Sequence, residues 1–105
     1  MLKEITIKGK IYPIKLGFNA EKHLQMEYGI TIYGLADNVA GFEPMLYYGI
    51  ESGCRETGQE FDLKREDIPY ILDDVEKEFA GIFKAFYFKS IDASSGEEAD
   101  PKKNL

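Results

Sequence analysis

Residues 43–58, EPMLYYGIESGCRETG, predict a helix on which apolar residues and two glycines lie side by side. Pro44 suits a first helical turn, and Gly58 is typical of the residue that ends a helix. Gly49 and Gly53 lie four residues apart, about one turn, so they share a face. With no side chains there, another backbone can approach closely. We therefore predict a helix that lets another backbone approach closely at its two glycines.

The segment before this helix predicts a β-hairpin. In LKEITIKGKIYPIKLGF, residues 2–18, apolar and polar residues alternate on both sides of a Lys-Gly-Lys turn, which is the pattern of paired strands. Pro13 has no backbone N–H, so the second strand is expected to have an unpaired edge there. Because an isolated two-stranded hairpin is marginally stable in water, it must pack on another part of the chain or on a second subunit.

Helical spacing covers most of the remaining chain. Asn19 is a good N-cap for a helix that Gly29 would end, and Thr31 could cap a short helix through Leu35. Asp67 could cap another short helix, and Asp73 or Asp74 the last one, whose apolar residues repeat every three or four positions. The expected fold class is α+β, mostly helical, with one folded domain over residues 1–91 and a disordered acidic tail over 92–105. Its expected elements are a hairpin over 3–16 and helices over about 19–28, 43–57, 67–73 and 74–90.

Composition argues against several functional classes. The formal net charge is −6 and the lysines and arginines are scattered, so neither nucleic acid nor membrane is expected as a partner. One cysteine and one histidine cannot form a disulfide or a Cys/His zinc site. The N-terminal MLKEITIKGK lacks an apolar signal core, and no apolar run approaches membrane-spanning length. We expect a protein of the reducing cytoplasm.

No set of residues converges on catalysis in the sequence. His23 and Cys54 are the only candidates for a base and a nucleophile, and nothing places them near one another. The acidic pairs at 66–67 and 73–74 lack the alternating oxygen spacing of a calcium loop and fit helix capping better. We therefore expect no enzyme activity, no metal site and no cofactor.

The aromatic residues carry the stronger hint of function. The chain has seven phenylalanines, seven tyrosines and no tryptophan. Adjacent helical positions point about 100° apart, so one of the neighbouring Tyr47 and Tyr48 is expected to face away from the core, and Phe88 to point away from Phe83 and its neighbours. These aromatics form either a thick core or a surface for a partner or a second copy. The candidate partner-binding residues are Tyr47, Tyr48, Phe86, Tyr87 and Phe88.

The order of these motifs resembles the tail assembly chaperones of long-tailed bacteriophages and of prophages derived from them. In that family a hairpin of the type G-K-x-Y-P-I-K precedes F-N and a helix, and M-L-Y-x-G-I then leads through a polar linker to L-x-x-E-D-I-x-x-x-L-D-D. The likeness covers residues 5 to about 90. The matching positions are Gly9, Lys10, Tyr12 to Lys15, Phe18, Asn19, Met45 to Tyr47, Gly49, Ile50, Leu63, Glu66 to Ile68 and Leu72 to Asp74.

The resemblance implies a non-enzymatic protein of the bacterial host cytoplasm. Such chaperones are thought to coat the tape measure protein before tail-tube subunits polymerise around it, so the implied partners are the tape measure and tail-tube proteins. Self-association is also expected, with the edge at Pro13 as one candidate surface. The ending Lys102-Lys103-Asn104 is compatible with a slippery codon run that yields a longer frameshifted product. The alternatives are a structural tail component that stays in the particle, or a small protein-binding adaptor unrelated to phage.

Overall fold

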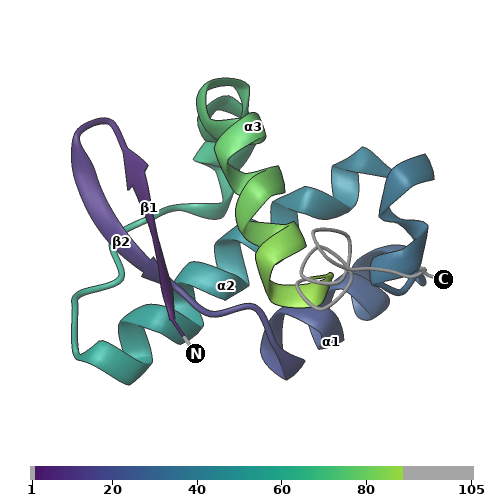
Figure 1. The fold of residues 1–105 in the computed structure, drawn as a ribbon, viewed down its shortest axis with the longest axis horizontal. Coiled ribbons are helices and arrows are strands. Elements are labelled where there is room, and N and C mark those ends of the chain that lie inside the picture. Colours follow the sequence, from purple (N-terminus) through teal and green to yellow (C-terminus); the bar gives the residue numbers. More distant parts are fainter. Residues whose placement is uncertain (1, 89–105) are drawn as a thin grey trace, which may run out of the picture.

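The computed structural model describes residues 2–88, which form a hairpin followed mainly by helices, and the α+β prediction is confirmed (Figure 1). The predicted acidic tail over 92–105 and the last three residues of the predicted domain lie outside the described residues. In chain order the elements are β1 (Lys3–Ile7), β2 (Lys10–Ile14), α1 (Phe18–Tyr28), two 3-10 helices (Ile32–Asp37 and Val39–Gly41), α2 (Phe42–Thr57), a third 3-10 helix (Arg65–Asp67) and α3 (Ile68–Tyr87).

The hairpin has a two-residue turn, and its register decides which backbone groups point outward. Lys8 and Gly9 both have positive φ angles, 52° and 82°, which is the combination of a type I′ turn. Pro13 lies opposite Glu4, and because Pro13 has no N–H, these two residues form a non-hydrogen-bonded pair. The N–H and C=O groups of Glu4 and Thr6 consequently point away from β2, toward the side where α3 lies.

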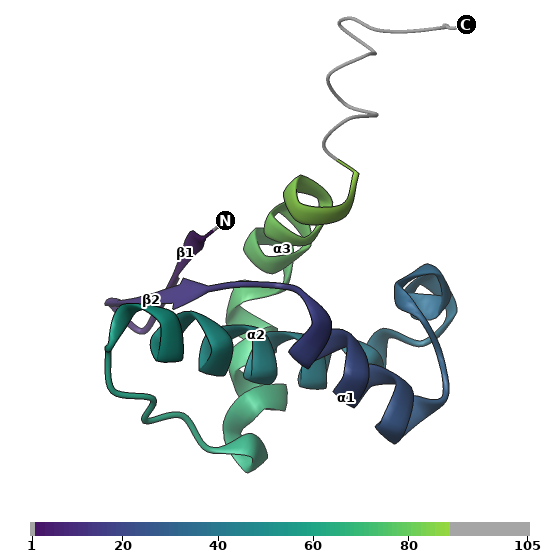
Figure 2. The same cartoon turned by 90° about the horizontal axis from the view of Figure 1, so that it is seen from below.

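The outer edge of β2 packs directly on α2, as Figure 2 shows. The backbone N–H of Lys15 donates to the carbonyl of Gly49 at 2.9 Å. A Cβ atom placed on Gly53 would lie 2.4 Å from the carbonyl oxygen of Pro13. The close backbone approach predicted from the two glycines is confirmed, and the approaching segment is β2. Pro13 is buried there, so the expectation that its edge is open to a second subunit is wrong.

The C-terminal helical region is one helix, α3, and the predicted separation into helices over 67–73 and 74–90 is wrong. Asp73 and Asp74 are exposed residues inside α3 and do not cap a new helix. The apolar stripe continues past them at steps of three and four, so burial of one uninterrupted face outweighs the local capping preference of aspartate. The helix ends at Tyr87. The buried residues of its stripe are Ile68, Ile71, Val75, Phe79 and Phe83.

The start of α1 also differs from the prediction. The helix begins at Phe18, with Gly17 as the preceding residue, so Asn19 lies within the first turn and is not the N-cap. At the other end Gly29 has a φ of 68° and ends the helix as predicted. The Thr31 hydroxyl accepts from the backbone N–H of Tyr33 at 3.3 Å, which confirms it as the cap of the following short helix.

One hydrophobic core joins the hairpin and the three long helices. Ile5, Leu24, Ile50 and Phe79 come from four different elements, and each is fully buried. The α3 helix crosses α2 and lies beside β1, and α1 packs along α2 (Figures 1 and 2). Most of α2 is buried or half-buried, and only its last turn is exposed, whereas α1 keeps an exposed outer face.

Candidate partner-binding site

Tyr47 and Tyr48, two of the predicted partner-binding residues, form the centre of a packed cluster on α2. The Tyr47 ring lies 5.0 Å from the Tyr48 ring and 5.0 Å from that of Phe61. His23 stacks on Tyr48 with ring centroids 3.5 Å apart, and the Arg65 guanidinium lies 5.9 Å from each tyrosine ring. Both tyrosines are half-buried, so neither faces fully away from the core. Their contacts with Phe61 and Arg65 hold the linker between α2 and α3 against α1 and α2.

Arg65 completes this cluster with a bidentate ion pair to Glu27. Its Nη1 and Nη2 atoms lie 2.8 and 2.5 Å from the two carboxylate oxygens of Glu27 on α1, and Glu43 is 4.0 Å away. The hydrogen bonds between Arg65 and Glu27 hold the pKa of Glu27 below its usual range. The same bonds raise the pKa of Arg65 above its usual value. We call Arg65, Glu27, His23, Tyr47 and Tyr48 the arginine cluster. Its contacts give it a structural role.

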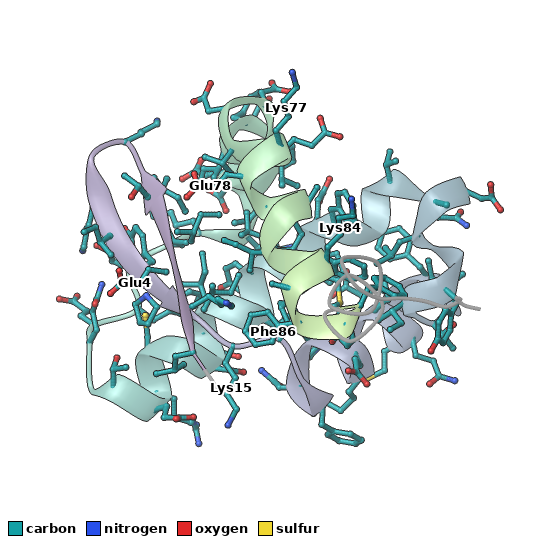
Figure 3. All side chains as sticks on the ribbon, viewed as in Figure 1. Glu4, Lys15, Lys77, Glu78, Lys84 and Phe86 are labelled. Atoms are coloured by element: carbon teal, nitrogen blue, oxygen red, sulfur yellow. The ribbon has the colours of Figure 1, made fainter. Side chains whose placement is uncertain are left out.

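The other three predicted residues lie at the end of α3. The Tyr87 hydroxyl donates to Glu21 of α1 at 2.7 Å, and burial together with this hydrogen bond raises the pKa of Tyr87. Phe88 lies 6.1 Å from the ring of Phe83, so it packs on that ring rather than pointing elsewhere as expected. Phe86 is half-buried on the side of α3 that faces β1 (Figure 3). All three extend the core at its margin.

These two groups do not form one surface. The arginine cluster contacts α1 at His23, whereas the end of α3 contacts α1 at Glu21. Positions two apart on a helix point about 200° from each other, so the two groups lie on opposite sides of α1. The predicted residues therefore pack in two separate places, each half-buried within the chain.

The most exposed aromatic side chains were missed by the sequence prediction. Phe18 is 81% exposed, Tyr33 77% and Tyr70 71%, and Met26 on α1 is 70% exposed. The sequence did contain a signal that Phe18 is exposed, since Phe18 lies on the opposite side of the helix from Ala20, where the buried face of α1 begins. Tyr33 and Tyr70 lie at the starts of helices, where periodicity is too short to assign a face.

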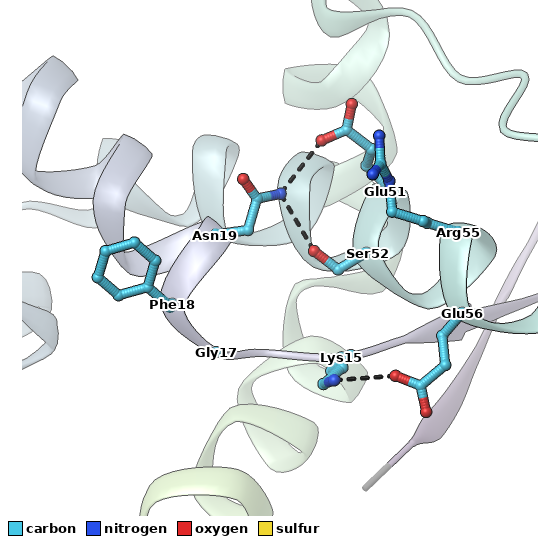
Figure 4. A pocket seen from close by; sticks show the side chains of 8 residues that line it. All are labelled: Lys15, Gly17, Phe18, Asn19, Glu51, Ser52, Arg55 and Glu56. Atoms are coloured by element: carbon cyan, nitrogen blue, oxygen red, sulfur yellow. Dashed lines mark hydrogen bonds and ion pairs between the residues drawn. The ribbon is translucent and has the colours of Figure 1, made fainter.

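Phe18 stands at the border of a groove between the start of α1 and the second half of α2 (Figure 4). The groove has a volume of about 650 Å³. Its lining combines two basic, two acidic and four uncharged residues: Lys15, Arg55, Glu51, Glu56, Gly17, Phe18, Asn19 and Ser52. We call this set the α1–α2 groove.

Asn19 joins the two walls of the groove. Its side-chain amide donates to Glu51 Oε1 and to Ser52 Oγ, each at 3.1 Å, so the residue predicted to cap α1 instead ties α1 to α2 (Figure 4). Lys15 lies 2.9 Å from Glu56, and this contact holds the pKa of Glu56 below its usual range. Both carboxylates of the groove are thus engaged by neighbouring side chains.

Arg55 differs from the other charged residues of the groove. It is exposed, and within residues 2–88 its guanidinium makes no ion pair or side-chain hydrogen bond. In Figure 4 it lies on the α2 wall, while Phe18 projects from α1 on the other side. Among the described residues, the α1–α2 groove therefore has an exposed arginine on one wall and an exposed aromatic ring on the other.

The candidates for chemistry have separate surroundings. Cys54 is 2% exposed, with its sulfur 3.8 Å from the carbonyl of Glu60, and burial raises the pKa of its thiol, opposite to what an activated nucleophile needs. His23 is stacked on Tyr48. Residues 2–88 hold no group of three or more His, Cys, Asp or Glu placed to bind a metal ion. Within the same range, no helix is both long and apolar enough to cross a membrane.

Comparison with known proteins found no relative of this chain. No protein-family model matches it, and neither a curated protein nor a solved structure is significantly similar. The motif order and the surface of the molecule are therefore the two observations that bear on its function.

Proposed function

We propose that the protein is a non-enzymatic tail assembly chaperone of a phage or prophage, which works in the bacterial cytoplasm. It would bind helical segments of the tape measure protein, and tail-tube components, while the tail assembles. The order of sequence motifs along residues 5–90 supports this proposal. The observation on the molecule itself that carries it is the 81% exposed Phe18 at the border of the α1–α2 groove.

A chaperone that shields an apolar helix needs exposed apolar side chains on an otherwise well-solvated surface. Phe18 and Met26 are eight residues apart on α1, so they lie within about 80° of each other on its outer face. Methionine is flexible and polarisable, which suits a surface that must fit varied helix segments. The net charge of −6 keeps the remainder of the surface hydrated.

Co-expression tests this function directly. The chain would be produced together with the product of the very long, coiled-coil-rich gene expected downstream of it, and the tagged chain purified at moderate salt. A soluble complex containing both proteins supports the chaperone function. Failure to recover the long protein, with the chain itself folded, would overturn it.

Mass spectrometry of purified tail particles separates a chaperone from a structural tail component. A chaperone is absent from finished particles or present far below one copy per tube subunit. A stoichiometric amount in the particle would show a structural component instead.

A further inference from the structure

We infer that the outer edge of β1 pairs with the same edge of a second copy of the chain, so that two hairpins form one four-stranded antiparallel sheet. The outer edge consists of the backbone N–H and C=O groups of Glu4 and Thr6, and we call it the β1 edge. The inference goes beyond the proposed function, because it holds for any role of the protein. It gives self-association a different surface from the one expected at Pro13, which is buried against α2.

The two edges of the hairpin differ in what covers them. The edge of β2 is covered by α2, where the carbonyl of Pro13 lies against Gly53. Figure 2 shows β1 on the side of the hairpin away from α2, with the end of α3 beside it. Glu4 and Thr6 are both exposed. The β1 edge is therefore the edge of this sheet at which another strand can be added.

The hydrogen bonds of the β1 edge are mostly unmade within the chain. Among residues 2–88, only the Thr6 N–H of this edge has a partner, a carboxylate oxygen of Glu78 on α3 at 3.4 Å. That distance exceeds the usual range for an N–H···O bond, so the contact is weak. The Thr6 C=O and both backbone groups of Glu4 have no hydrogen-bond partner in the described chain. Such an edge is a ready template for pairing with another strand.

The position of these groups along β1 makes the edge complementary to itself. In an antiparallel sheet, the two residues of a hydrogen-bonded pair exchange both N–H···O=C bonds. Because β1 runs from Lys3 to Ile7, two copies aligned about Ile5 place Glu4 of each opposite Thr6 of the other. Both pairs then use the groups that point outward, and the whole strand is paired. A two-fold axis at Ile5 generates this arrangement, which is the usual symmetry of a dimer.

The side chains favour the same register. If the copies were aligned about Glu4, two glutamates would lie directly opposite each other, which destabilises a strand pair. If they were aligned about Thr6, Glu4 would have to pair with Lys8, whose φ of 52° belongs to the turn. Aligned about Ile5, Glu4 faces Thr6 and lies diagonally across from Lys8 of the other copy. This register pairs the most strand residues without opposing like charges.

The α3 helix adds apolar surface beside the β1 edge. Ile82 and Phe86 follow Glu78 at steps of four, so the three residues form a row along one side of the helix. Glu78 contacts Thr6, and Phe86 lies on the side of α3 that faces β1 (Figure 3). A two-fold axis through the sheet places both α3 helices on the same face. Since Ile82 and Phe86 are half-buried in one chain, pairing of two chains would cover them further.

Proline substitutions on the two edges of the hairpin test this pairing. The oligomeric state of the full chain is measured by sedimentation velocity over a wide range of concentrations. We expect a monomer–dimer equilibrium with a dissociation constant on the order of 10–100 µM, as for other small interfaces. Thr6→Pro removes an outward N–H and should weaken dimerisation by at least about tenfold. The hairpin itself should persist, because this N–H points away from β2.

Ile11→Pro is the matched control. Ile11 lies opposite Thr6 in the same non-hydrogen-bonded pair, so its N–H points to the other edge of the hairpin. Dimerisation should stay within about twofold of wild type in this variant. A chain that stays monomeric at every concentration would overturn the inference. A dimer that Thr6→Pro weakens no more than Ile11→Pro would also overturn it, because another surface would then hold the copies together.

Disulfide crosslinking tests the register, and it remains decisive if Thr6→Pro fails to fold. Glu4→Cys and Thr6→Cys are made as separate variants and oxidised alone and mixed. Paired residues have Cα atoms about 5.5 Å apart, within reach of a disulfide, whereas diagonal neighbours lie about 7–8 Å apart. We expect crosslinked dimers mainly in the mixture, and none from wild type, whose Cys54 is 2% exposed. Equal yields in the mixture and in the single variants would overturn the inference.

A partner strand is the competing occupant of the β1 edge, and the same variants identify it. If the chain is monomeric and Thr6→Pro releases the co-expressed tape measure protein while Ile11→Pro does not, the edge binds a strand of that protein. The inference of a second copy is then overturned, and the proposed chaperone function stands. If the chain dimerises with the expected dependence on Thr6 but recovers no tape measure protein, the inference is supported and the chaperone function fails.

Discussion

The two faces of α2 hold the molecule together by opposite means. On one face Gly49 and Gly53 have no side chains, and the backbone of β2 lies directly against them. On the other face Tyr47 and Tyr48 present large rings, which Arg65 and its neighbours cover. The first face packs through backbone that cannot move aside, whereas the second packs through side chains that can rotate.

This difference predicts which face of α2 tolerates substitutions. A contact between two backbones leaves no room for even a methyl group, because either the helix or the hairpin would have to shift. A contact between side chains loses only the energy of the groups removed, since the remaining groups can relax or become hydrated. The glycine face is therefore expected to be the more sensitive one.

The largest effect is expected for Gly53→Ala. The new Cβ would lie 2.4 Å from the carbonyl oxygen of Pro13 and 2.8 Å from the backbone nitrogen of Ile14, so the hairpin and helix must separate. We expect the free energy of unfolding to fall by about 3 kcal/mol, the upper part of the usual range for overpacking. Urea denaturation followed by circular dichroism measures this change.

Gly81→Ala is the matched control for that prediction. Gly81 lies in α3, is exposed, and has no atom within 4 Å of the position of an added Cβ. The same substitution there should stabilise the protein by about 0.5–1 kcal/mol, because alanine favours the helix more than glycine does. If both variants changed stability alike, the close approach of β2 to α2 would be refuted.

A smaller loss is expected for Gly49→Ala on the same face. Its added Cβ would meet the side chains of Leu16, at 2.6 Å, and Ile14, at 3.1 Å, and side chains can change rotamer where backbone cannot. We expect a loss of about 1–2 kcal/mol, again from urea denaturation. A loss greater than that of Gly53→Ala would reverse the expected order and show that the backbone at Pro13 yields more easily than these two side chains.

On the aromatic face, Arg65→Met is expected to cost about 1–2 kcal/mol, because methionine keeps the apolar length of the side chain but removes the charged hydrogen bonds to Glu27. The Arg65 and Glu27 side chains are 31% and 30% exposed, so the unpaired carboxylate regains water and limits the loss. A double-mutant cycle with Glu27→Gln should give a coupling energy on the order of 1 kcal/mol. Strictly additive losses would contradict the pairing.

The sequence predicted the elements whose signals are local. The hairpin turn, Gly29 and Gly58 as helix ends, and Thr31 as a cap each depend on residues within a few positions, and the structure confirms them. The spacing of the two glycines also predicted a close backbone contact. It did not identify β2 as the other half of that contact, since Lys15 and Gly49 are 34 residues apart and Pro13 and Gly53 are 40 apart.

The candidate site was predictable to a lesser degree, because surface exposure depends on the whole fold. Tyr47 and Tyr48 look free when α2 is taken alone, but Arg65 reaches them from a linker whose path the sequence does not show. Asp73 and Asp74 fit a helix start locally, yet the apolar stripe on either side keeps one helix continuous. Phe18 was recognised only as part of a motif, although its place off the buried face of α1 was a signal for its exposure; the hollow beside it depends on the packing of Asn19 against α2.

The pH dependence of stability gives a finer test of the aromatic face. Arg65 lowers the pKa of Glu27 in the folded chain below its ordinary value of 4.5. The pairing therefore contributes stability at pH values above about 4.5, and that contribution is lost as the pH falls through the lower, folded pKa. Stability measured from pH 6 downward should fall less steeply below about pH 4.5 in Glu27→Gln than in wild type. Parallel curves for the two proteins would contradict the assigned role of Arg65.

The smallest effect on stability is expected for Phe18→Ala, which lies on neither face of α2. Because the ring is 81% exposed, its removal should change the free energy of unfolding by no more than about 0.5 kcal/mol, measured by the same urea titration. A loss above about 2 kcal/mol would show that the ring is packed in solution and would remove it as a free anchor. Unchanged stability together with lost partner binding would instead show that this aromatic residue is maintained for the interface, in contrast to Tyr47 and Tyr48, whose rings are used within the fold.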